Sequence, residues 1–150
     1  MFYRWGCLVV AAKGERTVLF VDDEPEILSA LRRCFRHEPY LIFTAAGSPE
    51  GIAWLERASI DLVVTDERLL GMSGTEFLRK VRALSPRTSR AILTGYPGED
   101  VIRRGLEAGA DSFLYKPWND DVLRRTVRRL LEIESSSAGG EVQFDIGGEA

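Results

Sequence analysis

Apolar residues recur along this chain in two alternating patterns. Short unbroken apolar runs predict buried strands at 17–21, 40–45, 61–66, 89–94 and 111–116. Between them, apolar residues spaced three and four apart predict amphipathic helices at 25–37, 48–58, 73–84, 98–109 and 119–134. Five strands alternating with five helices predict an α/β domain with a doubly wound parallel sheet, covered by helices on both faces.

Residues at the helix ends support these bounds. Pro25 suits the first turn of a helix, because the amide hydrogen that proline lacks has no partner there. Ser48 has the side chain of an N-cap and is followed by Pro49, while Gly109 suits the end of the fourth helix. The pattern of the third helix predicts four buried side chains, Phe77, Leu78, Val81 and Leu84.

The two ends of the chain lie outside this alternation. An arginine and the short apolar run from Cys7 to Ala12 resemble a signal peptide, but the run is too short for one. We therefore expect a disordered leader at 1–14 and a folded domain at 15–134. Residues 135–150 read as a Ser/Gly linker and a short tail whose alternating apolar residues are too few to fold alone.

Composition narrows the function classes. Of 150 residues, 45% are hydrophobic and 29% charged, which is ordinary for a globular domain. The net charge of −3 argues against a broad nucleic-acid-binding surface. No apolar run is long enough to cross a membrane. Cys7 and Cys34 are too few for a disulfide framework, so we expect a cytoplasmic protein.

Polar side chains follow the predicted strands at the point where each strand ends. Asp22 and Asp23 follow the first strand, Asp66 ends the third, Thr94 the fourth and Lys116 the fifth. The carboxyl ends of parallel strands meet at one edge, so these side chains are expected to converge. Adjacent carboxylates about 4 Å apart repel by about 4 kcal/mol at an effective dielectric near 20, which favours a cation between them. Acids without a histidine or cysteine ligand offer only hard oxygen donors, which suits Mg²⁺.

Four stretches at these strand ends resemble the receiver domain of bacterial two-component response regulators. They are VLFVDDEPEIL, DLVVTDERLLGMSG, AILTGY and FLYKPW, and the resemblance covers about 16–133. The resemblance implies a flavodoxin-like (β/α)5 fold with strand order 2-1-3-4-5. It also implies that Asp66 is the phosphoacceptor, and that Asp22 and Asp23 hold Mg²⁺ together with Asp66 and the backbone carbonyl of Arg68.

The resemblance implies roles for the residues of the last two strands as well. Thr94 would hydrogen-bond the phosphoryl oxygen, and Lys116 would pair first with the acids and then with the phosphate. Phe113 occupies the position of the switch aromatic, which turns inward as Thr94 moves. The peptide bond between Lys116 and Pro117 is expected to be cis, a form that is rare except before proline.

The partners that the resemblance implies are a histidine kinase or a phosphotransfer protein. His37, the single histidine, is predicted at the far end of the first helix, so the phosphoryl donor is a separate molecule. The resemblance also leaves open a homodimer through the helices at 98–109 and 119–134 and the strand at 111–116, and neither nucleic acid nor membrane is expected as a direct partner. The protein is not expected to be an enzyme beyond its own phosphorylation and slow dephosphorylation.

One departure from the family and two alternative functions stay open. Leu69 and Leu70 replace the usual Met-Pro, which frees the loop backbone and puts the geometry of the Arg68 carbonyl in doubt. The same acids could serve a Mg²⁺-dependent phosphohydrolase, although the expected Asp-x-Asp and a glycine-rich phosphate loop are lacking. The chain could also be a receiver-like interaction module that no longer needs phosphate. Leu70, in place of the usual proline, would then be a first departure from the phosphorylated members of the family.

A basic stripe on the predicted last helix has two readings. Its members are Arg124, Arg125, Arg128 and Arg129. A solvated face balanced by nearby acids is favoured over a partner surface, because oppositely charged residues are interspersed along the same helix.

Overall fold

A parallel six-stranded sheet forms the centre of the molecule. The computed structural model describes residues 2–5, 8–11, 14–96, 98–132 and 143–145. The strand order is β4-β3-β5-β6-β7-β8. The strands are β3 (Arg16–Val21), β4 (Tyr40–Ala45), β5 (Leu62–Thr65), β6 (Ser89–Thr94), β7 (Ser112–Tyr115) and β8 (Gln143–Asp145). The five strands predicted from the sequence lie in the order 2-1-3-4-5, which confirms the predicted fold class.

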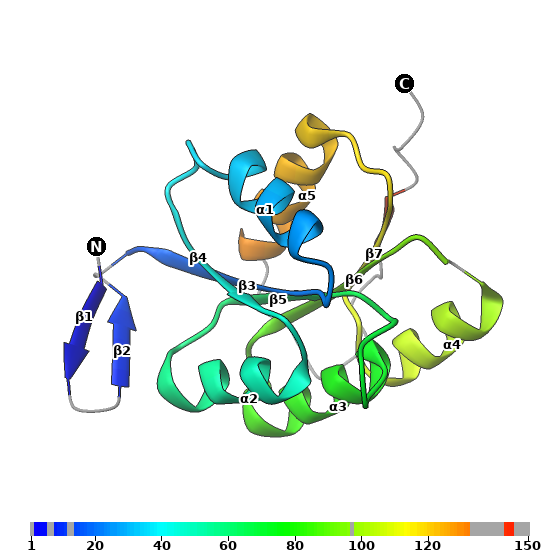
Figure 1. The fold of residues 1–150 in the computed structure, drawn as a ribbon, viewed down its shortest axis with the longest axis horizontal. Helices are drawn as coiled ribbons and strands as arrows, with labels where there is room; N and C mark the ends of the chain where they lie inside the picture. Colours follow the sequence, from blue (N-terminus) through cyan, green and yellow to red (C-terminus); the bar gives the residue numbers. More distant parts are fainter. Residues whose placement is uncertain (1, 6–7, 12–13, 97, 133–142, 146–150) are drawn as a thin grey trace.

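Helices cover both faces of this sheet. They are α1 (Pro25–Cys34), α2 (Ser48–Arg57), α3 (Gly74–Leu84), α4 (Glu99–Glu107) and α5 (Asp120–Glu132). In Figure 1, α1 and α5 lie on one face, and α2, α3 and α4 lie on the other. No helix among the described residues is both long and apolar enough to cross a membrane.

Each strand sends alternate side chains into two separate hydrophobic cores. On β3, Val18 and Phe20 pack with residues of α1 and α5, whereas Leu19 and Val21 pack with residues of α3. Successive strand residues point to opposite faces, so a strand buried on both sides has an unbroken apolar sequence. This is why apolar runs with no polar alternation correctly predicted the central strands.

Two predicted helix details differ from the structure. Ser48 is the first helical residue of α2 and not its N-cap, because Gly47 holds the N-cap position. Leu84 is 54% exposed, since it is the last residue of α3 and lies beyond the part of the helix that packs on the sheet. Gly109 has a φ of +83° after the end of α4, as predicted for a glycine that closes a helix.

Two short segments of the expected leader form strands in the structure. β1 (Phe2–Trp5) and β2 (Leu8–Ala11) pair as antiparallel strands, from Phe2 opposite Ala11 to Trp5 opposite Leu8. Aromatic and β-branched residues favour strands, and pairing satisfies backbone groups without a helix or a long apolar run.

Part of the short tail adds a strand to the edge of the sheet. β8 pairs in parallel with β7, with Phe144 opposite Phe113. Three residues are too few to fold alone, but the open edge of β7 supplies a template of backbone hydrogen-bonding groups. Most of the predicted linker, 135–142, lies outside the described residues.

Candidate functional site

The polar edge of the sheet is built by hydrogen bonds that continue the strand ladders. The amide of Asp66 donates to the carbonyl of Val21 at 2.9 Å, and the amide of Asp22 donates to the carbonyl of Ala45 at 3.1 Å. The amide of Lys116 donates to the carbonyl of Thr94 at 3.0 Å. These bonds hold the first residues after the strands in register, which brings their side chains to one edge as expected.

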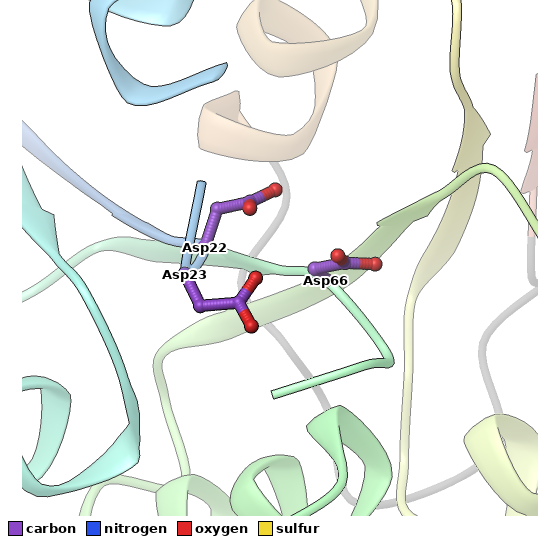
Figure 2. Close-up of side chains that lie close together, drawn as sticks. All are labelled: Asp22, Asp23 and Asp66. Carbon is purple, nitrogen blue, oxygen red and sulfur yellow. The ribbon is translucent and has the colours of Figure 1, made fainter. Parts of the chain in front are cut away.

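Three carboxylates gather at this edge. Asp22, Asp23 and Asp66 each offer an oxygen, and these oxygens lie within 4.8 Å of one another. Figure 2 shows Asp22 and Asp23 next to each other after β3, with Asp66 across from them after β5. Asp22 is 2% exposed and Asp66 is 7% exposed, while Asp23 is half-buried. The carboxylates therefore lie in a medium that weakens solvent screening of their repulsion.

Lys116 is the cation that the structure places among them. Its Nζ donates to Asp22 Oδ2 at 2.6 Å and to Asp66 Oδ2 at 3.2 Å. Burial alone would lower the pKa of Lys116, but the hydrogen bond and charge of Asp22, with those of Asp66, raise it. Burial raises the pKa of Asp22, because desolvation outweighs its bonds from Lys116 and the Glu24 amide. One ammonium does not compensate three buried or half-buried acids, so the cluster favours a further cation.

Both buried carboxylates are also oriented by backbone amides. Asp22 Oδ1 accepts from the Glu24 amide at 2.9 Å, and Asp66 Oδ1 accepts from the Glu67 amide at 2.8 Å. Each of these acids thus has one oxygen on an amide and the other on Lys116. Asp23 belongs to the same cluster, but neither of these two kinds of bond is found for it among the described residues.

The donor set fits a hard divalent cation. The cluster contains carboxylate oxygens only, with no histidine or cysteine in the group of acids. Mg²⁺ prefers one or two carboxylates and keeps several waters, so three acids at one edge are sufficient. The Arg68 backbone carbonyl, which the resemblance adds to this set, stays a prediction.

Thr94 and Phe113 lie where the sequence expects them. Thr94 ends β6 at the polar edge, and its Oγ1 accepts from the Tyr96 amide at 3.2 Å. Phe113 is 1% exposed and its ring packs against Gly105 of α4, where an added Cβ would lie 2.6 Å from the ring. The ring is therefore turned inward in this structure. The predicted cis bond between Lys116 and Pro117 is confirmed.

A groove of about 1010 Å³ lies between the β5–α3 loop, beginning with Glu67 next to Asp66, and the start of α4. Arg68 and Tyr96 both line it and are in contact, with the Arg68 guanidinium 3.7 Å from the centre of the Tyr96 ring. Leu70 is 80% exposed, whereas Leu69 packs against the core cluster beneath α3. The unusual Leu-Leu pair therefore divides into one residue that anchors the loop and one that faces solvent.

The arginine stripe on α5 is partly neutralised by acids. Arg124 pairs with Asp121 on its own helix. Both Arg124 and Arg128 also pair with Glu38, which lies in the loop after α1. Glu38 was not among the balancing acids expected from the sequence, since only the fold brings α1 and α5 together.

Sequence reasoning missed Glu67, the residue directly after Asp66. It is 5% exposed, and its Oε1 accepts from the Thr75 amide of α3 at 2.8 Å. Its Oε2 lies 3.3 Å from Nη2 of Arg104 on α4. The sequence did show a second acid, directly after Asp66 at the end of a buried strand. It could not show that the partner of this acid is Arg104.

Comparison with known proteins identifies the family that this arrangement resembles. A family model described as "Response regulator receiver domain" matches residues 18–128. The hydrogenase transcriptional regulatory protein HoxA of Cupriavidus necator is 37% identical over 121 residues, which is 80% of this chain and 25% of that protein. The sporulation initiation phosphotransferase F of Bacillus subtilis is 30% identical over 119 residues, 79% of this chain and 96% of that protein.

A solved structure gives the same result for the fold. A CheY-like response regulator receiver domain protein from Methanospirillum hungatei JF-1 superposes with a TM-score of 0.77 and 32% identity. The match covers 79% of this chain and 95% of that one. The chain spans only about a quarter of the length of relatives such as HoxA. These similarities favour neither a phosphohydrolase nor a phosphate-independent module.

Proposed function

This chain belongs to the family of response regulator receiver domains, which accept a phosphoryl group on an aspartate in two-component signalling, and we propose that Asp66 is that aspartate. The observation that carries the proposal is the single ammonium of Lys116 between Asp22 and Asp66 in a cluster of three acids. Receiver domains are generally signalling modules, so the activity expected of this chain is limited to its own phosphorylation and dephosphorylation.

The chain's own residues prepare Asp66 for in-line attack on a phosphoryl donor. A bond forms between phosphorus and an Asp66 oxygen, and the bond from phosphorus to the leaving atom of the donor breaks. The Glu67 amide and Lys116 each hold one Asp66 oxygen, so the carboxylate is oriented before the donor arrives. Lys116 can then follow the negative charge from the free carboxylate to the transferred phosphoryl group.

We assign Mg²⁺ to the acids of the same edge, because receiver domains bind this ion in an acidic pocket. Asp22, Asp23 and Asp66 would hold it together with the backbone carbonyl of Arg68. When bound, the ion supplies positive charge that stabilises the phosphoryl oxygens during transfer. The raised pKa of Asp22 supports this assignment, since burial still disfavours the charged carboxylate despite Lys116.

Thr94 and Phe113 are the proposed switch residues. Thr94 ends β6 at the polar edge, where its hydroxyl can donate to a phosphoryl oxygen on Asp66. Phe113 on the neighbouring strand β7 packs against Gly105, so a change at Thr94 can reach α4 through this ring. Movement of these two side chains would carry the phosphorylation state to the α4 face.

Intact mass after incubation with Mg²⁺ and acetyl phosphate tests the phosphoacceptor. The wild-type chain is expected to gain one phosphoryl group, and Asp66→Asn none. Asp100→Asn is the matched control, because Asp100 is an exposed acid on α4 whose ion pair is with Arg103. An adduct that persists in Asp66→Asn would refute the assignment.

The donor in the cell is proposed to be a histidine kinase or a phosphotransfer protein, since this is the role of partners in the family. A homodimer through α4, β7 and α5 remains a prediction. β8 lies on the outer edge of β7, so such a dimer would have to form around it.

A further inference from the structure

Glu67 makes three hydrogen bonds that join the proposed phosphoacceptor to α3, two through its backbone and one through its side chain. Its amide donates to Asp66 Oδ1 at 2.8 Å, and its carbonyl accepts from the Gly74 amide at 2.8 Å. Its side-chain Oε1 accepts from the Thr75 amide, also at 2.8 Å. Glu67 thus satisfies the first two amides of α3, and a negative charge at a helix N-terminus is favourable. The position of its own amide, which faces Asp66, is fixed by these bonds.

The second carboxylate oxygen of Glu67 points away from α3 and toward α4. Oε2 lies 3.3 Å from Nη2 of Arg104. The guanidinium of Arg104 is itself tied to its helix, because its Nε donates to the carbonyl of Asp100 at 3.2 Å. The ion pair therefore links Glu67, next to the proposed phosphoacceptor, with α4. This link is separate from the packing of Gly105 of α4 against Phe113.

We infer that Glu67 is a positioning residue for Asp66 and that its ion pair with Arg104 couples the position of α4 to the rate of phosphoryl transfer. The inference rests on the proposed function, because it assumes that Asp66 receives the phosphoryl group. The ion pair with Arg104 is not needed to cap α3, because the bonds from the Gly74 and Thr75 amides already do so.

The physical reason is the burial of the Glu67 charge. A carboxylate that is 5% exposed is destabilised when its cation is removed. Without Arg104, the side chain gains by turning toward the open groove that both residues line. Such a turn pulls the β5–α3 loop and moves the Glu67 amide away from Asp66 Oδ1. Any displacement of α4 that breaks the pair also takes the cation away from Glu67, so it acts on Asp66 in the same way as loss of Arg104.

Four variants separate this role from general effects of charge. Arg104→Gln removes the cation, and Arg104→Lys restores a positive charge. Arg103→Gln is the matched control, since Arg103 is the preceding residue and pairs with the exposed Asp100. Glu67→Gln keeps an acceptor for the Thr75 amide but removes the charge that Arg104 neutralises.

Initial rates of phosphorylation by acetyl phosphate, followed by intact mass, are the measurement. Arg104→Gln is expected to lower the rate about fivefold or more, the lower range of typical coupling between sites. Arg104→Lys should recover most of the rate, and Arg103→Gln should leave it unchanged. In a Glu67→Gln background, Arg104→Gln should have no further effect, because the charge that it leaves unpaired is absent.

Each outcome separates this inference from the proposed function. If the wild-type chain gains no phosphoryl group, the proposed function itself fails. If the wild-type chain is phosphorylated and Arg104→Gln behaves as Arg103→Gln, the inference is overturned while the proposed function stands. A lower unfolding midpoint in Arg104→Gln with an unchanged rate, measured where each variant is fully folded, also overturns it. If Glu67→Gln does not fold, the three arginine variants decide alone.

Discussion

Lys116 binds Asp22 more closely than it binds Asp66. Its Nζ lies 2.6 Å from Asp22 Oδ2 and 3.2 Å from Asp66 Oδ2. The ammonium is thus anchored on an acid that need not react, and it holds the proposed phosphoacceptor by the longer bond. This asymmetry lets Lys116 move with the charge of a phosphoryl group on Asp66 without losing its own partner.

Removal of the ammonium should therefore slow phosphorylation more than it alters the fold. We expect Lys116→Met to lower the rate with acetyl phosphate by about 100-fold, the typical effect of removing one group that stabilises transition-state charge. Lys80→Met is the control, because Lys80 is exposed on α3. Equal rates in Lys116→Met and Lys80→Met would show that Lys116 is only structural.

Mg²⁺ should stabilise the fold through the acid cluster. A ligand at about 100 times its Kd adds about 2.7 kcal/mol to the free energy of unfolding, if the unfolded chain does not bind it. We expect a gain of this size for the wild-type chain in urea unfolding with and without Mg²⁺, and its loss after chelation. Asp23→Asn should remove most of the gain, and Asp100→Asn should keep it. The same gain in both variants would place the ion elsewhere.

Gly74 should be intolerant of any side chain. A Cβ at this position would clash with the backbone oxygen of Asp66, and a backbone atom cannot turn aside as the end of a flexible side chain can. We expect Gly74→Ala to lower the free energy of unfolding by about 3 kcal/mol or more, as for severe overpacking. A Cβ at Gly98 meets no atom within 4 Å, so Gly98→Ala should change it by about 1 kcal/mol at most. Urea unfolding curves of the two variants test this, and a neutral Gly74→Ala would contradict the close approach of α3 to Asp66.

Cys34 should be unreactive in the native protein. Burial, with the nearby Asp120, raises the pKa of its thiol from 9.0 to about 12. In a Cys7→Ser variant, where Cys34 is the only thiol, alkylation near pH 8 should be about 1,000-fold slower in the native than in the unfolded chain. The native rate should still rise between pH 9 and 12, where the unfolded thiol is already ionised.

The raised pKa of Cys34 also predicts how the free energy of unfolding changes with pH. The folded chain keeps its thiol proton over a range in which the unfolded chain has lost it. The contribution of Cys34 to the free energy of unfolding therefore falls as pH rises from about 9 to about 12. A native alkylation rate equal to that of the unfolded chain would refute the burial of this thiol.

The hydrophobic pattern along the chain predicted the sheet and most of its polar edge. The central strands are buried on both faces, so their apolar runs end abruptly, and the first polar residue after each run lies at the carboxyl edge. For this reason the pattern predicts that Asp22, Asp66 and Lys116 lie close together, as they do in the structure. The strand order required the resemblance to a family, because periodicity fixes elements but not their neighbours.

Contacts between elements far apart in the chain depend on how the folded elements pack, and the local pattern did not predict them. Glu67 meets Arg104 because α3 and α4 cover the same face of the sheet, and no local pattern records that pairing. The pairing of β8 with β7 likewise depends on an open sheet edge and not on the propensity of three residues. Local periodicity reports which face of an element is apolar, whereas the partner of a buried charge is set by how those faces pack together.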